Sequence, residues 1–322
     1  MKYVFVCPDI KFLTIQYRDF LYNEDTDLVS IGGARKIAKF LNHRLKLYKF
    51  KLLSLFLNLF FKSYFKRMKF NGSAEKICFV LYARTYEDFR TSIIRYLRKK
   101  YSGCVICVYF GDLMKRHLCD LDSVRKDVDY VFTFDDGEAK KFGVNYLLEP
   151  FSLSVGNMEE LSDDSKYESF DISFVGHAKD RFQKIVDIYS VLKEKDIKCD
   201  MHISGVDKQY MKFKEDIKYG AIDFISLLMT VVNSKCILEI MQNNGISPTT
   251  RFAEAIVLKR YLLTDCVFFK NNKYPNVIYY EKLDDLKKMD FSFLRETPIV
   301  RDEDISLFSI NNMVLSINKV IK

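Results

Sequence analysis

Residues 236–255, CILEIMQNNGISPTTRFAEA, run from a short apolar segment through a polar turn into the start of a helix. The apolar run Ile237–Ile240 has the length and composition of a buried strand. Ser247 is a favourable N-cap and Pro248 suits the first helical position, so we expect a helix over 249–258. Such a strand–turn–helix unit is typical of α/β proteins with a mainly parallel sheet.

Comparable units recur along the whole chain of 322 residues. In the first half we expect strands at 3–6, 77–82, 105–110, 130–133 and 146–148. In the second half we expect them at 172–175, 199–203, 237–240, 261–264 and 277–280. Expected helices include 86–100, 137–142, 181–195, 227–233, 249–258 and 305–319. The sequence thus predicts an α/β protein with two Rossmann-like domains facing each other across a cleft at the carboxyl ends of the strands.

Residues 154–169 are polar, acidic and poor in large aliphatic side chains, which is typical of a linker. We therefore expect an N-terminal domain over 1–153 and a C-terminal domain over 170–300. The last segment, 301–322, is expected to form a helix that crosses back to the N-terminal domain. Domains of about 150 residues are a common size, which agrees with this division.

The composition is that of a globular protein, with 48% hydrophobic and 29% charged residues. The N-terminus enters a strand-like run at once and lacks the features of a signal peptide. No apolar stretch approaches the ~20 residues that a membrane-spanning helix needs. We therefore expect a cytoplasmic protein.

Metal sites and disulfides are not expected. The eight cysteines are scattered, and Cys104 and Cys107 lie on an expected strand, where residues three apart point to opposite faces. The four histidines show no spacing typical of a metal site. We interpret the cysteines as buried apolar side chains and predict no metal and no cofactor.

The net charge of +8 is concentrated in residues 43–70, which carry eight Lys or Arg residues and no Asp or Glu. The polar positions 51, 54, 58, 62, 66 and 69 form one stripe along a helix, with leucine and aromatic residues around it. Such a basic amphipathic helix can lie on an anionic membrane surface. The alternative is a core helix whose lysines line a solvent edge. A nucleic-acid partner is not expected, because the lysines flank an apolar core and do not alternate with stacking aromatics.

Polar side chains gather where the helix after Pro248 begins. A helix N-terminus offers free N–H groups and a partial positive charge, which suit a diphosphate. Thr249, Thr250 and Arg251 add hydroxyl and guanidinium donors there, and Glu254 lies one turn later, where it can accept hydrogen bonds from ribose hydroxyls. The alternative is a surface ion pair between Arg251 and Glu254.

A second strand–turn–helix unit covers 170–181 and ends in the sequence GHAKDR. Gly176 closes the strand, and a small residue there permits the close approach of a ligand. Lys179 and Arg181 follow in positions that suit a phosphate. The alternative is a turn glycine with two solvated cations.

Together these segments resemble the second domain of GT-B glycosyltransferases from bacterial capsule and lipopolysaccharide synthesis. The resemblance rests on FDISFVG at 170–176, KDR at 179–181, ILEI at 237–240, Gly245, TTRFAEA at 249–255, LLT at 262–264 and VFTFDDGEAKKFG at 131–143. It implies that Thr250, Arg251 and Glu254 hold the nucleotide of a sugar donor, that Lys179 and Arg181 lie near its phosphates, and that no metal is needed.

An inverting transfer also needs a base for the acceptor hydroxyl. Asp112 follows the strand 105–110 and is the first candidate, and Asp9, after the first strand, is the second. The family often has Trp-Asp at the first place, whereas this chain has Gly111. A loop or N-cap carboxylate is the alternative for both aspartates. Gly32 and Gly33 suggest a phosphate loop or a plain helix start, and we favour the helix start because no strand is evident before them.

The sequence therefore predicts a metal-independent GT-B glycosyltransferase of the hexosyltransferase class. Its donor is a nucleotide sugar, and its acceptor is a lipid-linked or oligosaccharide precursor of a surface polysaccharide. Residues 43–70 hold it, in this interpretation, at the inner face of the cell membrane. Two alternatives remain: a nucleotide-sugar epimerase of the same fold, and a non-catalytic membrane-associated binding protein in polysaccharide assembly.

Overall fold

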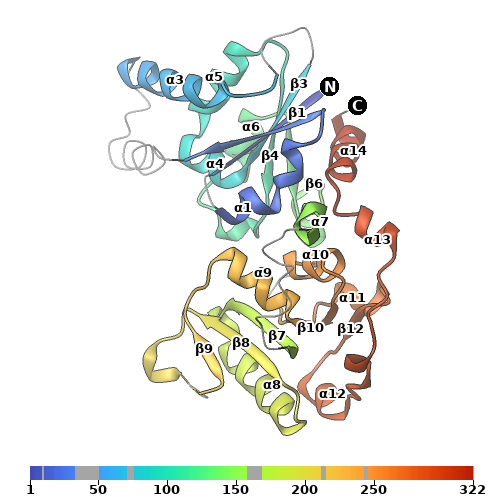
Figure 1. Ribbon diagram of the computed structural model, residues 1–322. Helices are drawn as coiled ribbons and strands as arrows, with labels where there is room; N and C mark the ends of the chain where they lie inside the picture. The colour runs from blue at the N-terminus through green and yellow to red at the C-terminus, as the bar shows by residue number, and fades with distance from the viewer. Residues whose placement is uncertain are drawn as a thin grey trace. The chain divides into compact units, whose positions relative to one another are not determined.

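The computed structural model describes residues 1–8, 11–32, 51–70, 76–157, 169–211, 215–242 and 246–321. The chain divides into two compact units (Figure 1). Unit 1 comprises Met1–Ser152 together with Ile310–Lys322, and unit 2 comprises Leu153–Ser309. Each unit is built on its own six-stranded sheet.

The sheet of unit 1 has the strand order β2-β1-β3-β4-β5-β6, and all neighbouring strands are parallel. Its strands are β1 (Lys2–Pro8), β2 (Thr26–Ile31), β3 (Ile77–Tyr82), β4 (Val105–Phe110), β5 (Tyr130–Thr133) and β6 (Asn145–Tyr146). The central strands β1, β3 and β4 are buried almost throughout, as strands covered on both faces must be. Their near-continuous apolar sequences follow from this burial.

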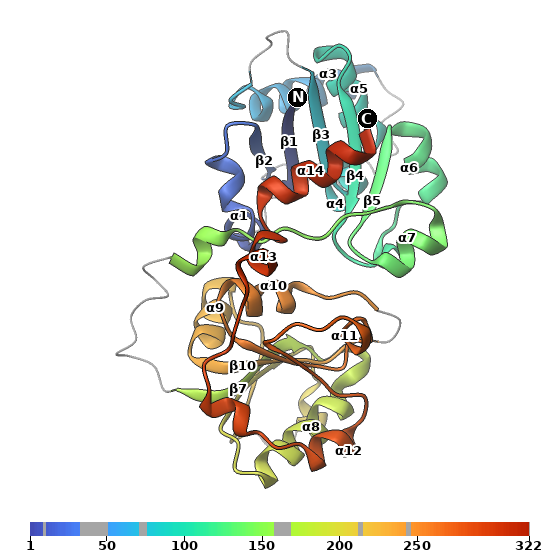
Figure 2. The same ribbon diagram turned by 90° about the vertical axis from the view of Figure 1, so that its right-hand side faces the viewer.

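Helices cover both faces of this sheet (Figure 2). Val4 and Val6 of β1 share a core with α3 (Lys51–Phe65) and α5 (Thr91–Lys100), whereas Phe5 and Cys7 point to the other face and pack with α14 (Ile310–Ile321). The remaining helices of unit 1 are α1 (Lys11–Gln16), α4 (Ala83–Phe89), α6 (Leu121–Asp127), α7 (Asp136–Phe142) and the 3-10 helices η1 (Arg18–Leu21) and η3 (Met114–Arg116).

Unit 2 repeats this design with the order β12-β11-β10-β7-β8-β9, again parallel throughout. Its strands are β7 (Phe170–His177), β8 (Cys199–Ser204), β9 (Ile217–Tyr219), β10 (Ser234–Glu239), β11 (Tyr261–Thr264) and β12 (Val277–Tyr279). Its helices are α8 (Phe182–Glu194), α9 (Phe224–Val232), α10 (Thr250–Val257), α11 (Phe268–Asn271), α12 (Leu283–Lys288), α13 (Asp302–Ser306) and the 3-10 helices η4 (Leu153–Asn157), η6 (Lys179–Arg181), η7 (Lys208–Tyr210) and η8 (Ser292–Arg295).

Both sheets are doubly wound, so each has a point where the strand order reverses. In unit 1 this switch point lies between β1 and β3, and in unit 2 it lies between β7 and β10. Ligands of open α/β sheets bind outside the carboxyl ends of the strands at such points. The residues after β1 and β3, and those after β7 and β10, are therefore the first places to look for a functional site.

The predicted α/β fold with two doubly wound sheets is confirmed, and β3, β4, β5 and β11 have the predicted bounds. The edge strands β2 and β9 are not predicted by the sequence. The expectation that no strand precedes Gly32 and Gly33 is wrong, because β2 ends at Ile31; Gly33 itself lies outside the described residues. β2 carries polar residues, so its sequence lacks the continuous apolar run of a buried strand. Thr26 is nevertheless fully buried, and its hydroxyl donates to the Phe20 carbonyl oxygen at 2.8 Å.

The helix predicted over 86–100 is two helices in the structure. Arg90, with φ of 47°, separates α4 from α5. This left-handed backbone conformation ends one helix and redirects the chain into the next.

The described part of the basic segment, residues 51–70, forms α3 and the turn that follows it. Leu57, Phe61, Phe65 and Met68 are buried in the core of unit 1, where Phe61 and Phe65 both contact the ring of Tyr96. These four apolar side chains are therefore not available to a membrane, whereas Leu59 is 61% exposed, and the membrane contact of residues 43–70 stays a prediction. Residues 43–50 lie outside the described residues. Within the described ranges, none of the helices combines the length and apolar character that crossing a membrane requires.

Candidate functional site

A group of buried polar side chains lies at the carboxyl edge of the unit 2 sheet. Glu239, the last residue of β10, accepts hydrogen bonds from Thr249 Oγ1 at 2.6 Å and Thr264 Oγ1 at 2.5 Å. Each hydroxyl oxygen also accepts a backbone N–H, from Arg251 at 3.2 Å and from Cys266 at 3.0 Å. Both hydroxyl protons are thus directed to the carboxyl group of Glu239. This cluster, which we call the Glu239 clamp, ties together the ends of β10 and β11 and the start of α10.

Helix α10 begins one residue later than the predicted start at 249, and its N-cap lies two residues later than the predicted N-cap Ser247. Thr249 is the N-cap, and Ser247 and Pro248 precede the helix. The predicted N-cap at Ser247 and first position at Pro248 are therefore wrong. The hydroxyl of Thr249 caps the helix and bonds to Glu239 at the same time, and this second bond is invisible in the local sequence.

Arg251 and Glu254 form an ion pair across one turn of α10, next to Thr250 at the start of the helix. This is no surface pair, because Glu254 is fully buried and the Arg251 side chain is only 18% exposed. Burial raises the pKa of Glu254, and the charge of Arg251 opposes this rise. The second oxygen, Oε1, is buried and has no hydrogen-bond partner among the residues that the structure describes. A buried acceptor without a partner is costly, and the described residues supply no donor for this oxygen, so a role in ligand binding stays a prediction.

Arg181 occupies the switch point of unit 2. Its guanidinium donates to the carbonyl oxygen of His177 at the end of β7 and to that of Ile240 just after β10. Burial lowers the pKa of Arg181, whereas the carboxylates of Glu239 and Asp265 oppose this change. Arg181 is therefore held by the backbone at the ends of both switch-point strands, and its role as a phosphate-binding cation stays a prediction.

The turn before Arg181 is packed more tightly than the sequence suggests. A Cβ atom at Gly176 would lie 2.9 Å from the Phe174 ring and 3.1 Å from the Arg181 guanidinium. The space beside Gly176 is thus filled by side chains of the protein, and the glycine makes room for Arg181. Lys179 is exposed, and its N–H donates to His177 Nδ1 at 3.3 Å. Of the three residues predicted in this turn, Arg181 joins the cluster.

Sequence reasoning missed Glu239, Thr264 and Asp265. Asp265 is buried, pairs with Lys184 and accepts the Met241 N–H at 2.6 Å. Each missed residue ends or directly follows a buried apolar strand. A polar residue that closes such a run is the signal that could have identified them.

Of the two predicted bases in unit 1, Asp112 is described and Asp9 lies outside the described residues. Asp112 pairs with Arg116 at 2.8 Å and accepts the Leu113 N–H at 2.9 Å, and its side chain is 48% exposed. This is the environment of a solvated loop carboxylate. Its role as a base stays a prediction.

The structure explains why position 111 is a glycine. A Cβ atom there would lie 2.1 Å from the Tyr82 hydroxyl oxygen. Tyr82, the last residue of β3, therefore occupies the place that a side chain at position 111 would take, and its ring contacts Tyr109 with a centroid distance of 5.9 Å.

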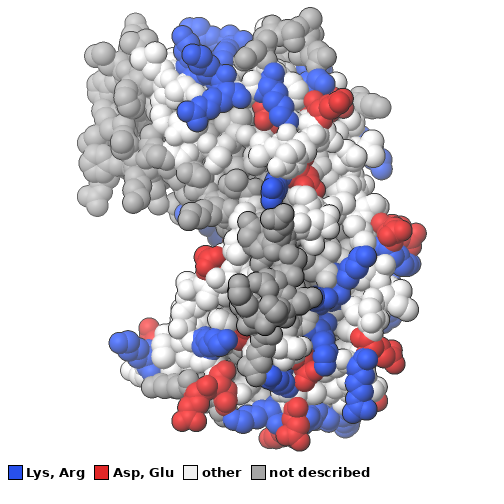
Figure 3. Space-filling view, in the orientation of Figure 1, with Lys and Arg blue, Asp and Glu red and all other residues white. Residues whose placement is uncertain are grey.

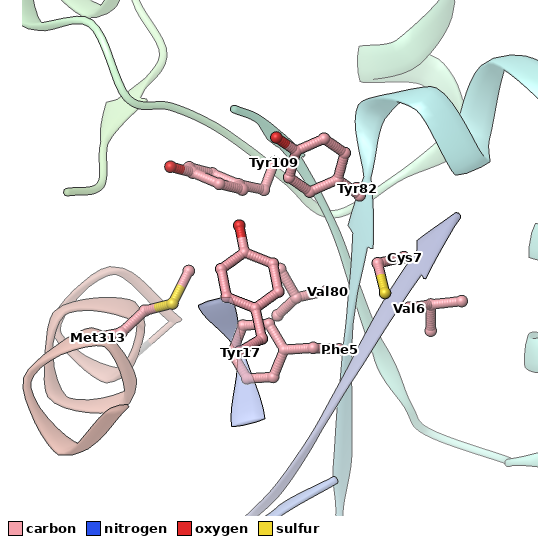
Figure 4. A pocket seen from close by; sticks show the side chains of 8 residues that line it. All are labelled: Phe5, Val6, Cys7, Tyr17, Val80, Tyr82, Tyr109 and Met313. Atoms are coloured by element: carbon pink, nitrogen blue, oxygen red, sulfur yellow. The ribbon is translucent and has the colours of Figure 1, made fainter. Parts of the chain in front are cut away.

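A pocket on this side of unit 1 lies at its switch point (Figure 4). Figure 4 shows the hydroxyl of Tyr17 pointing toward the rings of Tyr82 and Tyr109. The pocket is lined by Phe5, Val6, Cys7, Tyr17, Val80, Tyr82, Tyr109 and Met313. Tyr17 donates to Glu149 Oε1 at 3.0 Å, and sequence reasoning missed this carboxylate.

The cysteines are buried apolar side chains where the sequence predicts them, at Cys78, Cys104, Cys107 and Cys236. Cys78 and Cys107 sit on neighbouring strands with their sulfur atoms 3.7 Å apart, as free thiols. Among the described residues, no group of three His, Cys, Asp or Glu side chains is arranged to hold a metal ion.

No protein-family model and no curated protein matches this chain. Several solved structures match it in fold. The Anabaena protein Alr3699/HepE in complex with UDP and glucose matches with a TM-score of 0.60 at 8% identity, over 100% of this chain and 99% of that chain. An α-glucosyltransferase in complex with UDP-glucose and DNA containing an abasic site matches at 0.56 and 12%, over 97% and 92%. The lipopolysaccharide outer core galactosyltransferase WaaB matches at 0.50 and 13%, over 100% and 99%. With its two parallel six-stranded sheets flanked by helices, this chain has the GT-B fold of these glycosyltransferases.

Proposed function

We propose that this protein is a glycosyltransferase that moves a sugar from a nucleoside-diphosphate donor onto a precursor of a surface polysaccharide. The observation that carries the proposal is the buried, unpartnered Oε1 of Glu254 beside Arg251 at the start of α10. Among the described residues, Arg251 bonds to one oxygen of the Glu254 carboxyl group, Oε2. In this proposal the other oxygen, Oε1, accepts a hydrogen bond from a ribose hydroxyl of the donor.

The cations of the same edge suit the phosphates of the donor. The charges of Arg251 and Glu239 both act on Arg181, so the two arginines share one neighbourhood. Together with the free N–H groups at the start of α10, they can stabilise the charge that develops on the leaving diphosphate. In this proposal Arg251 and Arg181 take the role that a metal ion plays in other transferases, and Thr250 and Lys179 contribute further donors.

The comparisons support the choice of substrates. HepE and the α-glucosyltransferase were both solved with UDP or UDP-glucose, and WaaB acts in the lipopolysaccharide outer core. UDP-sugars are therefore the first donors to test, and a lipid-linked or oligosaccharide precursor is the first acceptor.

We also propose that unit 1 contacts the anionic inner face of the cell membrane. Figure 3 shows Lys and Arg side chains gathered over the region of α3 and α5. This surface, called the basic edge here, consists of the exposed residues Lys62, Lys66, Arg67, Arg95, Lys99 and Lys100. Since Leu57, Phe61 and Phe65 of α3 are buried, the contact in this proposal is mainly electrostatic.

The test of the proposed function is the thermal stability of the protein in the presence of UDP, GDP, CDP and dTDP. A nucleotide at 100 times its dissociation constant should add about 2.7 kcal/mol. For a unit of this size that is a rise in melting temperature of about 5–10 °C. Arg251→Ala and Glu254→Gln should abolish the rise, whereas Arg295→Ala, an exposed arginine of η8, should retain it.

The other outcomes separate the alternatives. A protein that responds to no nucleotide is better explained as a non-catalytic binding protein of polysaccharide assembly. A protein that binds nucleotide and converts the donor sugar into its epimer without any acceptor is an epimerase.

A further inference from the structure

Glu149 lies at the carboxyl edge of the unit 1 sheet and is held there by contacts with a distant part of the chain. Tyr17 donates to its Oε1 at 3.0 Å. On the next residue, the Pro150 carbonyl oxygen accepts the Gln16 side-chain amide at 3.1 Å. Ser152 then donates its N–H to the Gln16 carbonyl oxygen at 2.8 Å. The segment that carries Glu149 is therefore fastened to the segment of Tyr17 at three successive points.

Groups from three elements act on the Glu149 carboxyl group. Tyr17, which follows α1, and Tyr82, which ends β3, favour its charged form by hydrogen bonding together with Gln16, whereas Asp112, which follows β4, opposes it by its charge. The charge of Glu149 in turn helps to raise the pKa of Tyr109 on β4. Tyr17, Tyr82 and Tyr109 also line the pocket at the switch point. Glu149 thus contacts a residue that lines this pocket, at the edge of the sheet where open α/β sheets bind ligands.

The environment of Glu149 gives it a proton affinity that suits a base near neutral pH. Burial raises its pKa to about 7, the charge of Asp112 adds to this, and hydrogen bonds from Tyr17, Gln16 and Tyr82 oppose it. Burial also raises the pKa of Tyr17, Tyr82 and Tyr109, so these hydroxyls stay protonated donors. A general base works best when its pKa lies near the working pH. When two neighbouring carboxyl groups lie in different environments, their pKa values often differ, and one of them transfers the proton while the other stays ionised.

We propose that Glu149 accepts the proton of the acceptor hydroxyl, with Tyr17 and Tyr82 as positioning residues for its carboxyl group. This inference rests on the proposed function. In the reaction, the acceptor oxygen forms a bond to the sugar carbon while its proton passes to the Glu149 carboxylate. The bond from that carbon to the diphosphate breaks, and its electron pair leaves with the nucleoside diphosphate. Glu149 afterwards releases the proton to water.

The position of the Tyr82 side chain requires a glycine at position 111, so a substitution there perturbs the same site in a second way. A methyl group at position 111 cannot coexist with the present place of the Tyr82 hydroxyl, because a Cβ atom there would lie 2.1 Å from that oxygen. Gly111→Ala therefore displaces a positioning residue without changing any ionisable group.

The test uses the full chain and the hydrolysis of a nucleotide sugar, with water as the acceptor. The probe is UDP-glucose, GDP-glucose, CDP-glucose or dTDP-glucose, according to the nucleotide that raises the melting temperature. Glu149→Gln should lower kcat at least about 100-fold, the range of general base catalysis, with KM and the nucleotide-induced rise in melting temperature unchanged. Glu281→Gln, an exposed glutamate of unit 2, is the matched control and should leave kcat unchanged.

The pH profile separates a base from a structural residue. In the wild-type protein kcat should rise with pH to a plateau above a midpoint of about 7. Tyr17→Phe should move this midpoint to higher pH, because it removes a hydrogen bond that lowers the Glu149 pKa. Gly111→Ala should lower kcat while the nucleotide affinity stays unchanged.

The inference fails if nucleotide binds and Glu149→Gln retains wild-type kcat, or if Asp112→Asn abolishes hydrolysis while Glu149→Gln does not. It also fails if the bound donor is not hydrolysed at any pH, since a base beside the site should activate water. If no nucleotide binds, the proposed function fails instead, and the thermal-shift experiment shows this without reference to Glu149.

Discussion

Glu239→Gln is the sharpest perturbation of the site in unit 2, because it keeps the volume of the side chain and changes only what it can accept. In the Glu239 clamp both carboxylate oxygens accept a hydroxyl proton, from Thr249 and Thr264. Glutamine keeps one acceptor and turns an amide NH2 toward the other hydroxyl. That hydroxyl oxygen can accept from the amide as well as from the backbone N–H, but its own proton then has no acceptor at position 239.

The expected cost follows from the bonds that are lost. A hydrogen bond to a charged acceptor contributes about 1.5–3 kcal/mol, and a buried donor left without a partner adds to the loss. Removal of a buried charge offsets part of this, since burial raises the pKa of Glu239. We therefore expect a net loss of about 2 kcal/mol, or a fall in melting temperature of about 4–8 °C for a unit of this size.

The assay is a double-mutant cycle with Thr264→Val, measured by thermal and urea unfolding. In the Thr264→Val background the amide can face the valine methyl and turn its oxygen to Thr249, so Glu239→Gln should cost less than about 1 kcal/mol. The coupling between the two positions should therefore be about 1 kcal/mol or more. Glu281→Gln, whose side chain is 63% exposed, is the matched control and should stay within about 0.5 kcal/mol of the wild type.

Additive costs in this cycle would refute the reasoning. So would a single Glu239→Gln substitution that costs less than about 0.5 kcal/mol, since the two hydroxyls would then not depend on the carboxylate. Because the clamp sets the position of Thr249, the same variant should also weaken the binding of the nucleotide.

Two further predictions concern unit 1. The pKa of Glu149 is about 7, against about 4.3 in an unfolded chain, so the folded protein holds an extra proton between these values and its free energy of unfolding falls as pH rises through this window. Glu149→Gln should remove this dependence, so that the difference in stability from the wild type changes by about 2 kcal/mol or more between pH 4.5 and 8 in urea unfolding; a constant difference would contradict the prediction. For the basic edge, flotation with vesicles that contain phosphatidylglycerol should fall about 100-fold or more in a variant with four lysine or arginine residues changed to glutamate, at Lys62, Lys66, Arg95 and Lys99. The control variant has the same net charge and carries glutamate at Lys259, Lys273, Lys282 and Lys287 of unit 2; equal flotation of the two variants would exclude the basic edge as the contact.

The interiors of the sheets could be predicted because strands buried on both faces must be apolar throughout. This is why the bounds of β3, β4 and β11 follow from the sequence alone. Edge strands are less constrained, and β2 carries Thr26 and Asp27, which find buried partners elsewhere in unit 1. The basic segment shows the same limit for a helix. An amphipathic pattern fixes which side of α3 is apolar, but it does not say whether protein or membrane covers that side.

The residues of the candidate site in unit 2 can be grouped from the sequence only where they are close along the chain. Thr249, Thr250, Arg251 and Glu254 lie within two turns of one helix, so their spacing is enough to group them. Glu239 and Thr264 meet because they are register partners on β10 and β11, which the sequence does not state. Glu149 and Tyr17 lie still further apart along the chain and meet only through the packing of unit 1.

The two switch points differ in charge, and this difference supports the roles proposed for them. In unit 2 the carboxylate of Glu239 shares its surroundings with the guanidinium groups of Arg181 and Arg251. In unit 1 the groups that act on Glu149 are the hydroxyls of Tyr17 and Tyr82, the amide of Gln16 and a second carboxylate, Asp112. A diphosphate is stabilised by cations and repelled by carboxylates, whereas a neutral hydroxyl that must lose a proton needs a carboxylate that holds it near neutral pH. If the roles were reversed, the donor would lie beside two carboxylates in unit 1, and the acceptor hydroxyl would face arginines that cannot take its proton. Charge alone therefore favours the donor in unit 2 and the acceptor in unit 1.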